Sequence, residues 1–106
     1  MSALVFMALY RPKPGKEMEL NEVLKGHITT LREEGLITDR ELLTLQADDG
    51  TIIEIAEWKS KEAIDTAHQS PTVMAVWNQI GELAELTSLS TLAEAQYPFP
   101  NFKALK

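Results

Sequence analysis

Residues 48–59 read DDGTIIEIAEWK, a turn followed by a strand, and this stretch decides how the chain folds. The turn at residues 48–50 supplies the positive φ that a tight hairpin needs. We therefore predict two antiparallel strands, over residues 38–47 and 51–59. The second strand is apolar on both faces, because successive side chains point to opposite sides: Ile53 and Ile55 on one face, and Ile52, Ala56 and Trp58 on the other.

The segments before this hairpin predict a strand and a long helix. Residues 3–10 form an apolar run that stops at two prolines and a glycine within residues 11–15, which predicts a buried strand with apolar side chains on both faces. Over residues 16–34 an apolar stripe predicts an amphipathic helix that ends near Gly35. The stripe consists of Leu20, Leu24, His27 and Leu31.

The segments after the hairpin predict two helices, a strand and a tail. Ser60 is placed to cap a short helix reaching Gln69, and Ser70-Pro71 begins a helix reaching about residue 86. Residues 86–96 are predicted as the last strand. The tail over residues 97–106 is extended by its prolines. The order β-α-β-β-α-β predicts an α+β fold with a ferredoxin-like sheet and its helices on one face.

Composition indicates the class of protein. The 106 residues fit a single domain over 1–106, and 44% hydrophobic with 25% charged residues is ordinary for a globular protein. A net charge of −6 argues against nucleic-acid or membrane partners, which require clustered Lys and Arg. Since the chain has no cysteine and no recognisable signal peptide, we expect a cytoplasmic protein.

The two apolar faces of the predicted sheet imply a partner. Helices cover only one face, and leaving the other in water would forfeit about 25 cal/mol per Å² of apolar surface. A second copy of the chain is the simplest cover, so we expect a homodimer. The aromatic tail, with Tyr97, Phe99 and Phe102, is expected to dock on the domain or on its twin.

Residues 55–63, IAEWKSKEA, followed by AHQSP at 67–71, resemble the antibiotic biosynthesis monooxygenase (ABM) family. The resemblance spans nearly the whole length and implies a dimeric α+β barrel. It also implies that the face bearing Trp58 lines a substrate pocket. In relatives that oxidise polyketide dihydroquinones without a cofactor, a Trp at this position works beside an Asn, a Tyr and an Arg. Those three positions correspond here to Glu54, Ile64 and Trp77 or Asn78.

Other branches of the family match less well. The side chains of heme-degrading relatives correspond to Tyr10, Ala67 and Trp77 here, and all three differ, which disfavours heme degradation. Quinol-degrading relatives carry two His residues at positions that correspond to Ala67 and Thr72. His68 lies one residue from the first of these.

Glu54 and Trp58 are the first candidates for the site, because they share a strand face. A partly desolvated Glu54 carboxylate would suit a general base, and its alternative is a solvated position or an ion pair with Lys or Arg. For Trp58 the alternative to a pocket wall is core packing with its indole N–H bonded to a carbonyl. Tyr10 is a further candidate for the pocket.

The helices contribute the remaining candidates. His27 lies on the apolar stripe, where an imidazole orients a substrate oxygen or moves a proton, although a core histidine is the commoner role. His68 is also a catalytic candidate, with an interaction at a helix end as its alternative. Trp77 is a candidate for the pocket wall on a stripe that is otherwise core.

These observations lead to one leading functional expectation and two alternatives. The sequence lacks the spacings typical of metal sites and has no glycine-rich phosphate loop, so we expect no metal and no cofactor. The resemblance implies a cofactor-free monooxygenase for a small phenolic or quinol-like aromatic substrate. The alternatives are a non-catalytic ligand-binding or stress-response domain, and an isomerase or lyase that uses the same pocket.

Overall fold

A computed structural model describes residues 2–105, so the two terminal residues of the expected 1–106 domain lie outside it. Its centre is a pair of antiparallel strands, β1 (Leu4–Pro12) and β3 (Ile52–Trp58). Three short strands complete the sheet: β2 (Leu43–Gln46), β4 (Ala84–Thr87) and β5 (Lys103–Leu105). The strand order is β4-β1-β3-β2-β5, and every neighbouring pair is antiparallel. The predicted ferredoxin-like α+β fold is confirmed.

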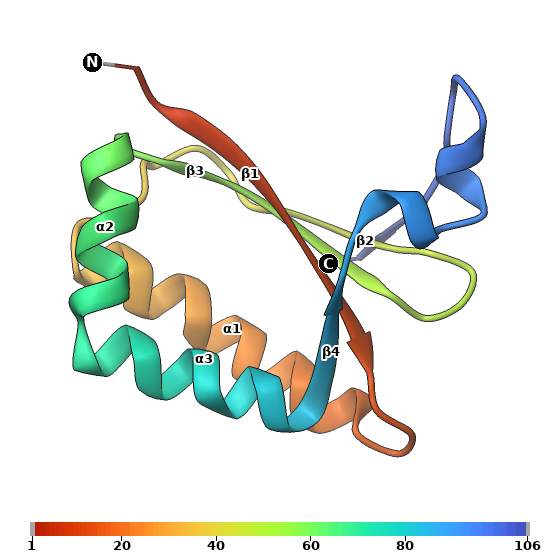
Figure 1. Ribbon diagram of the computed structural model, residues 1–106, viewed down its shortest axis with the longest axis horizontal. Helices are drawn as coiled ribbons and strands as arrows, with labels where there is room; N and C mark the ends of the chain where they lie inside the picture. The colour runs from red at the N-terminus through yellow and green to blue at the C-terminus, as the bar shows by residue number, and fades with distance from the viewer. Residues whose placement is uncertain (1, 106) are drawn as a thin grey trace.

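Three helices lie on one side of this sheet (Figure 1). They are α1 (Glu17–Glu33), α2 (Lys61–Gln69) and α3 (Pro71–Leu83). The predicted caps form, since Ser60 Oγ accepts a hydrogen bond from the Ala63 N–H at 3.1 Å and Ser70 Oγ accepts one from the Val73 N–H at 3.2 Å. These caps satisfy backbone donors that a helix start leaves unpaired, and they fix where α2 and α3 begin.

The register decides which side chains face the helices. In β1 and β3, Ala8 lies opposite Glu54 and Tyr10 lies opposite Ile52. Directly opposed residues share a face, so these four side chains point toward the helices. We call this side the helix face and the opposite side the open face. Val5, Met7 and Leu43 lie on the open face and are 58%, 44% and 48% exposed.

The chain itself covers part of the open face. After β4, residues 88–96 form two 3-10 turns, Leu89–Thr91 and Glu94–Gln96, on the side away from the helices (Figure 1). We call residues 88–96 the strap. Its Leu92 is 1% exposed and packs in one cluster with Leu9 and Ile53 of the open face.

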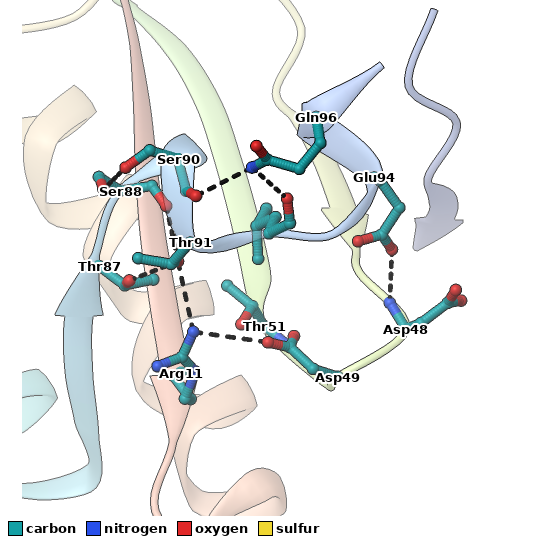
Figure 2. Close-up of polar contacts among 11 residues, drawn as sticks. Arg11, Asp48, Asp49, Thr51, Thr87, Ser88, Ser90, Thr91, Glu94 and Gln96 are labelled. Atoms are coloured by element: carbon teal, nitrogen blue, oxygen red, sulfur yellow. Dashed lines mark hydrogen bonds and ion pairs between the residues drawn. The ribbon is translucent and has the colours of Figure 1, made fainter.

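Polar contacts fix the strap to the rest of the sheet (Figure 2). Arg11 Nη2 lies 3.5 Å from Asp49 Oδ2 and 3.3 Å from Thr91 Oγ1, so it joins β1, the β2–β3 turn and the strap. Glu94 Oε2 accepts a hydrogen bond from the backbone N–H of Asp48 at 2.7 Å. The strap is therefore tied to the turn at two points.

Two expectations for the fold were wrong in part. The predicted strand over residues 86–96 ends at Thr87, because the strap turns instead of extending. The predicted strand over residues 38–47 is reduced to Leu43–Gln46, preceded by an isolated bridge between Ile37 and Trp58. Within the tail, Phe102 packs beside Leu9, whereas Tyr97 and Phe99 are 72% and 87% exposed on the single chain, so docking of these two side chains on a twin stays a prediction.

Within residues 2–105 no helix has the length and apolar character needed to cross a membrane.

Candidate functional site

A cavity of about 360 Å³ lies between the helix face of the sheet and the helices. Its walls are mainly apolar and aromatic, as is usual for pockets that bind small organic molecules. Three of its lining residues, Tyr10, His27 and Trp77, are also joined by hydrogen bonds to one another or through Glu54. The lining comprises Phe6, Ala8, Tyr10, His27, Trp58, His68, Trp77, Ile80, Gly81 and Leu86.

Glu54 is the centre of this polar network and is only 2% exposed. Its Oε1 atom accepts a hydrogen bond from the Tyr10 hydroxyl at 3.0 Å and lies 2.9 Å from His27 Nδ1. The strand register makes these contacts possible. The opposite residue, Ala8, is small, and Tyr10 is the diagonal neighbour that an aromatic side chain reaches. Within residues 2–105, Glu54 is therefore neither solvated nor paired with a Lys or Arg.

His27 takes one defined tautomer in this network. Trp77 Nε1–H donates to His27 Nε2 at 2.9 Å, and an indole N–H cannot accept. His27 Nε2 must therefore carry the lone pair, so the hydrogen lies on Nδ1 and is donated to Glu54. His27 is 4% exposed, and both ring nitrogens are held, Nδ1 by the Glu54 carboxylate and Nε2 by the Trp77 indole.

Tyr10 acts as a neutral donor. Burial raises the pKa of its hydroxyl far above the ordinary value, and the adjacent negative charge of Glu54 and the hydrogen bond to Glu54 raise that pKa further. Ionisation of Tyr10 would place a second negative charge beside Glu54 in a site with little water. The phenol therefore keeps its hydrogen at neutral pH and holds the carboxylate in place.

The remaining two candidates line the cavity without joining the network. Trp58 is buried, stacks obliquely on Phe6 with ring centroids 5.1 Å apart, and belongs to the core as well as to the cavity wall. His68 is exposed, and its Nδ1 lies 2.8 Å from the Ile64 carbonyl oxygen, to which it donates. Its ring meets the edge of Trp77 at a centroid distance of 5.0 Å. His68 thus borders the cavity beside Trp77.

The sequence patterns identified all four members of the hydrogen-bonded network but not their connections. They also missed five lining residues: Phe6, Ala8, Ile80, Gly81 and Leu86. The absence of a side chain at Gly81 leaves space beside the cavity, which single-sequence periodicity does not reveal. Within the described residues, no group of three or more His, Cys, Asp or Glu side chains is placed to hold a metal ion.

The fold and the cavity define the class of protein first: a ferredoxin-like α+β domain with an apolar pocket between sheet and helices. The sequence pattern of the family described as antibiotic biosynthesis monooxygenase matches residues 3–78. The chain belongs to this family, whose scaffold is that of a monooxygenase-like or small-molecule-binding domain.

A solved structure supports the same assignment. Rv0793 from Mycobacterium tuberculosis is similar, with a TM-score of 0.65 and 25% sequence identity over 81% of this chain and 91% of that chain. The chain has no match among the curated proteins. The likeness to Rv0793 and the family match together confirm the resemblance inferred from residues 55–71.

Proposed function

We propose that this protein is a cofactor-free monooxygenase that deprotonates and oxidises a small phenolic or quinol-like aromatic molecule in the 360 Å³ cavity. The observation that carries the proposal is the chain of contacts from Trp77 through His27 to Glu54. A histidine whose Nδ1–H is held by a buried carboxylate presents its Nε2 lone pair as a base, which is the arrangement used in general base catalysis.

In the proposed reaction, a substrate hydroxyl gives its proton to His27 Nε2. The resulting aromatic anion is electron-rich and transfers one electron to O₂, after which the two radicals combine in a C–O bond. The resulting peroxide anion takes a proton back from His27, and the hydroperoxide loses water as the ring C–H and O–O bonds break, so one oxygen atom stays in the quinone and the other leaves as water. The protein supplies the base, the shape of the cavity and the exclusion of water, while the substrate supplies the electrons.

Trp77 has a specific part in this proposal. Its indole N–H occupies the His27 lone pair that the substrate needs, so an incoming hydroxyl has to replace it. Trp77 is half-buried: it packs against the core, but it also touches the exposed His68 and lines the cavity, so the displacement takes place at the border of the cavity. The indole then becomes an aromatic wall for the substrate ring.

The proposal also includes a homodimer. On the open face, Val5, Met7 and Leu43 remain exposed beside the half-buried Leu45 and Ile55, and the strap does not cover them. A second copy packed on this face would bury the patch and leave the cavity, which lies on the helix face, open to substrate.

The test is oxygen uptake with a panel of hydroquinones and phenols. We expect turnover by the wild type and a fall in kcat of about 10²-fold or more in Glu54→Gln, because the amide no longer stabilises a positively charged His27. The matched control is Glu57→Gln, three residues along β3 and therefore on the open face, which should keep its activity.

Three results would contradict the monooxygenase. Absence of oxygen uptake across the panel excludes it. Conversion of a substrate without oxygen, still lost in Glu54→Gln, would indicate the isomerase or lyase chemistry instead. Binding of aromatic ligands without any conversion would indicate a ligand-binding domain.

A further inference from the structure

Glu54 also borders a second cavity, of about 400 Å³, on the opposite side of the network from the first. This cavity lies between α1 and the edge of the sheet formed by β2 and β5. Its wall includes Asn21, Leu24 and Lys25 of α1, Leu42 and Thr44 at β2, and Leu105 of β5. None of these residues lines the first cavity, and Glu54 is the member of the hydrogen-bonded network that borders the second.

The two carboxylate oxygens of Glu54 have different surroundings. Oε1 accepts from both Tyr10 and His27, whereas Oε2 has no hydrogen bond to any residue in the described chain. Among the fully buried side-chain polar atoms of residues 2–105, Thr51 Oγ1 is the one without a partner. Glu54 Oε2 therefore retains some accessible surface, and Glu54 lines the second cavity but not the first.

The polar atoms around the second cavity suit water. Thr44 lies directly opposite Glu54 in the β2–β3 register, and Asn21 and Lys25 are exposed at the helix side. A water molecule is retained where it finds two to four polar partners, and a carboxylate oxygen with a nearby hydroxyl and amide supplies them. The second cavity lies on the helix face, so the proposed dimer leaves it open.

We propose that the second cavity is a proton path that connects Glu54 to solvent while substrate fills the first cavity. This proposal rests on the proposed function, because it concerns the fate of the proton that His27 removes. With substrate bound, His27 and Tyr10 have no direct contact with bulk water on the side of the first cavity. Glu54 Oε2 then provides the remaining route.

The transfer proceeds in balanced steps. The substrate O–H bond breaks as His27 Nε2–H forms, and the His27 Nδ1–H bond breaks as an O–H bond forms on Glu54. Rotation of the carboxyl group exchanges its two oxygens and turns the hydrogen toward the second cavity, where a water molecule accepts it. His27 Nε2–H later gives its proton to the peroxide oxygen that leaves as water. The reverse sequence then carries a proton from solvent through Glu54 to His27 Nδ1 and restores the starting tautomer.

The test measures exchange of the His27 Nδ1 hydrogen with water by NMR, which requires no substrate because this hydrogen is donated to Glu54 and leaves through it whether or not the first cavity is filled. Thr44→Ile fills the second cavity next to Glu54, and we expect exchange to slow by about tenfold or more, as for a hydrogen that loses its solvent access. Leu42→Phe fills the same cavity from a different position and should act alike. If Thr44→Ile fails to fold, Leu42→Phe keeps the test decisive.

Two controls separate the possible routes. Leu43→Phe adds the same bulk one residue away on the open face and should leave exchange unchanged. Gly81 lines the first cavity and a Cβ there meets no atom within 4 Å, so Gly81→Leu adds a side chain to this cavity without a clash of its Cβ, and it should also leave exchange unchanged. Slower exchange in Gly81→Leu but not in Thr44→Ile, or no slowing in any variant, would overturn the proposed path.

A turnover measurement then distinguishes the two proposals. If the protein oxidises phenols, Thr44→Ile should lower kcat and raise the solvent isotope effect while KM stays the same. If it shows no oxidation at all, the monooxygenase proposal fails, yet the exchange experiment still decides whether Glu54 communicates with solvent through the second cavity.

Discussion

Tyr10 is a phenol that must stay neutral in the folded protein, and this has a consequence for stability. Its pKa is raised by burial and by the charge of Glu54, while in the unfolded chain Tyr ionises near pH 10, as free Tyr does. Below that pH both states carry the proton, and the contribution of Tyr10 to stability is complete. Above it, only the unfolded state loses the proton, so this contribution falls with rising pH.

We predict that Tyr10→Phe is less stable than the wild type by about 1–3 kcal/mol at pH 8, because Glu54 loses a buried donor. The difference in free energy of unfolding between wild type and variant should shrink above pH 10 by about 1.4 kcal/mol per pH unit. The wild type loses stability there because its folded state keeps the Tyr10 phenol neutral, whereas the variant has no phenol at this position. Urea unfolding between pH 8 and pH 11 measures both effects. Tyr97→Phe, at a residue that is 72% exposed, is the control. Stability curves for wild type and Tyr10→Phe that remain parallel above pH 10 would contradict the prediction.

At the residue scale, the sequence predicted which side chains matter better than it predicted how they meet. Alternation along residues 51–59 placed Glu54 and Trp58 on one face, and the helical stripe placed His27 toward the sheet. Contact between His27 Nδ1 and Glu54 depends on how α1 is rotated about its axis and how far it lies along β3. These are properties of packing between elements, which local patterns do not contain.

At the scale of elements, the strap is the part that sequence reasoning described wrongly. Its apolar residues Leu89, Leu92 and Ala95 are three apart, which is the period of a 3-10 helix rather than the alternation of a strand. The helices were predicted well because Ser60 and Ser70 are caps with a local mechanism. The three-residue β5 was missed because so short a strand has no recognisable sequence pattern and is a strand only through its pairing with β2.

We predict that Leu92→Ala destabilises the protein by about 2–4 kcal/mol, because it leaves a cavity against Leu9 and Ile53 that the neighbours fill only partly. The measurement is the midpoint of urea unfolding. Leu89→Ala, in the same strap but 39% exposed, should cost less than about 1 kcal/mol. Equal losses in the two variants would mean that the strap does not pack on the sheet as described.

At the scale of the whole molecule, the exposed apolar side chains on the uncovered part of the open face favour a partner subunit. We predict that the wild type sediments at about twice 11.9 kDa at micromolar concentration. Met7→Asp places a charge in the centre of the exposed patch and should give a monomer, because a buried unpaired carboxylate is costly. Met18→Asp, on α1 and 83% exposed, should remain a dimer.

A monomeric wild type would exclude the proposed homodimer. A dimer that persists in Met7→Asp would place the interface elsewhere, for which the exposed Tyr97 and Phe99 of the tail are the next surface to change.

The strap also bears on the order in which the molecule folds. Because β4 and β5 lie at opposite edges of the sheet, residues 88–102 have to cross its whole width, and their contacts join segments far apart in the chain, such as Arg11 and Thr91. We expect such contacts to form late. Closing the long loops between these segments costs conformational entropy, and the contacts offset this cost only after β4 and β5 have paired at the two edges of the sheet. The crossing segment should therefore be the last part to become ordered and the first to open, while the hydrogen-bonded network on the helix face stays intact.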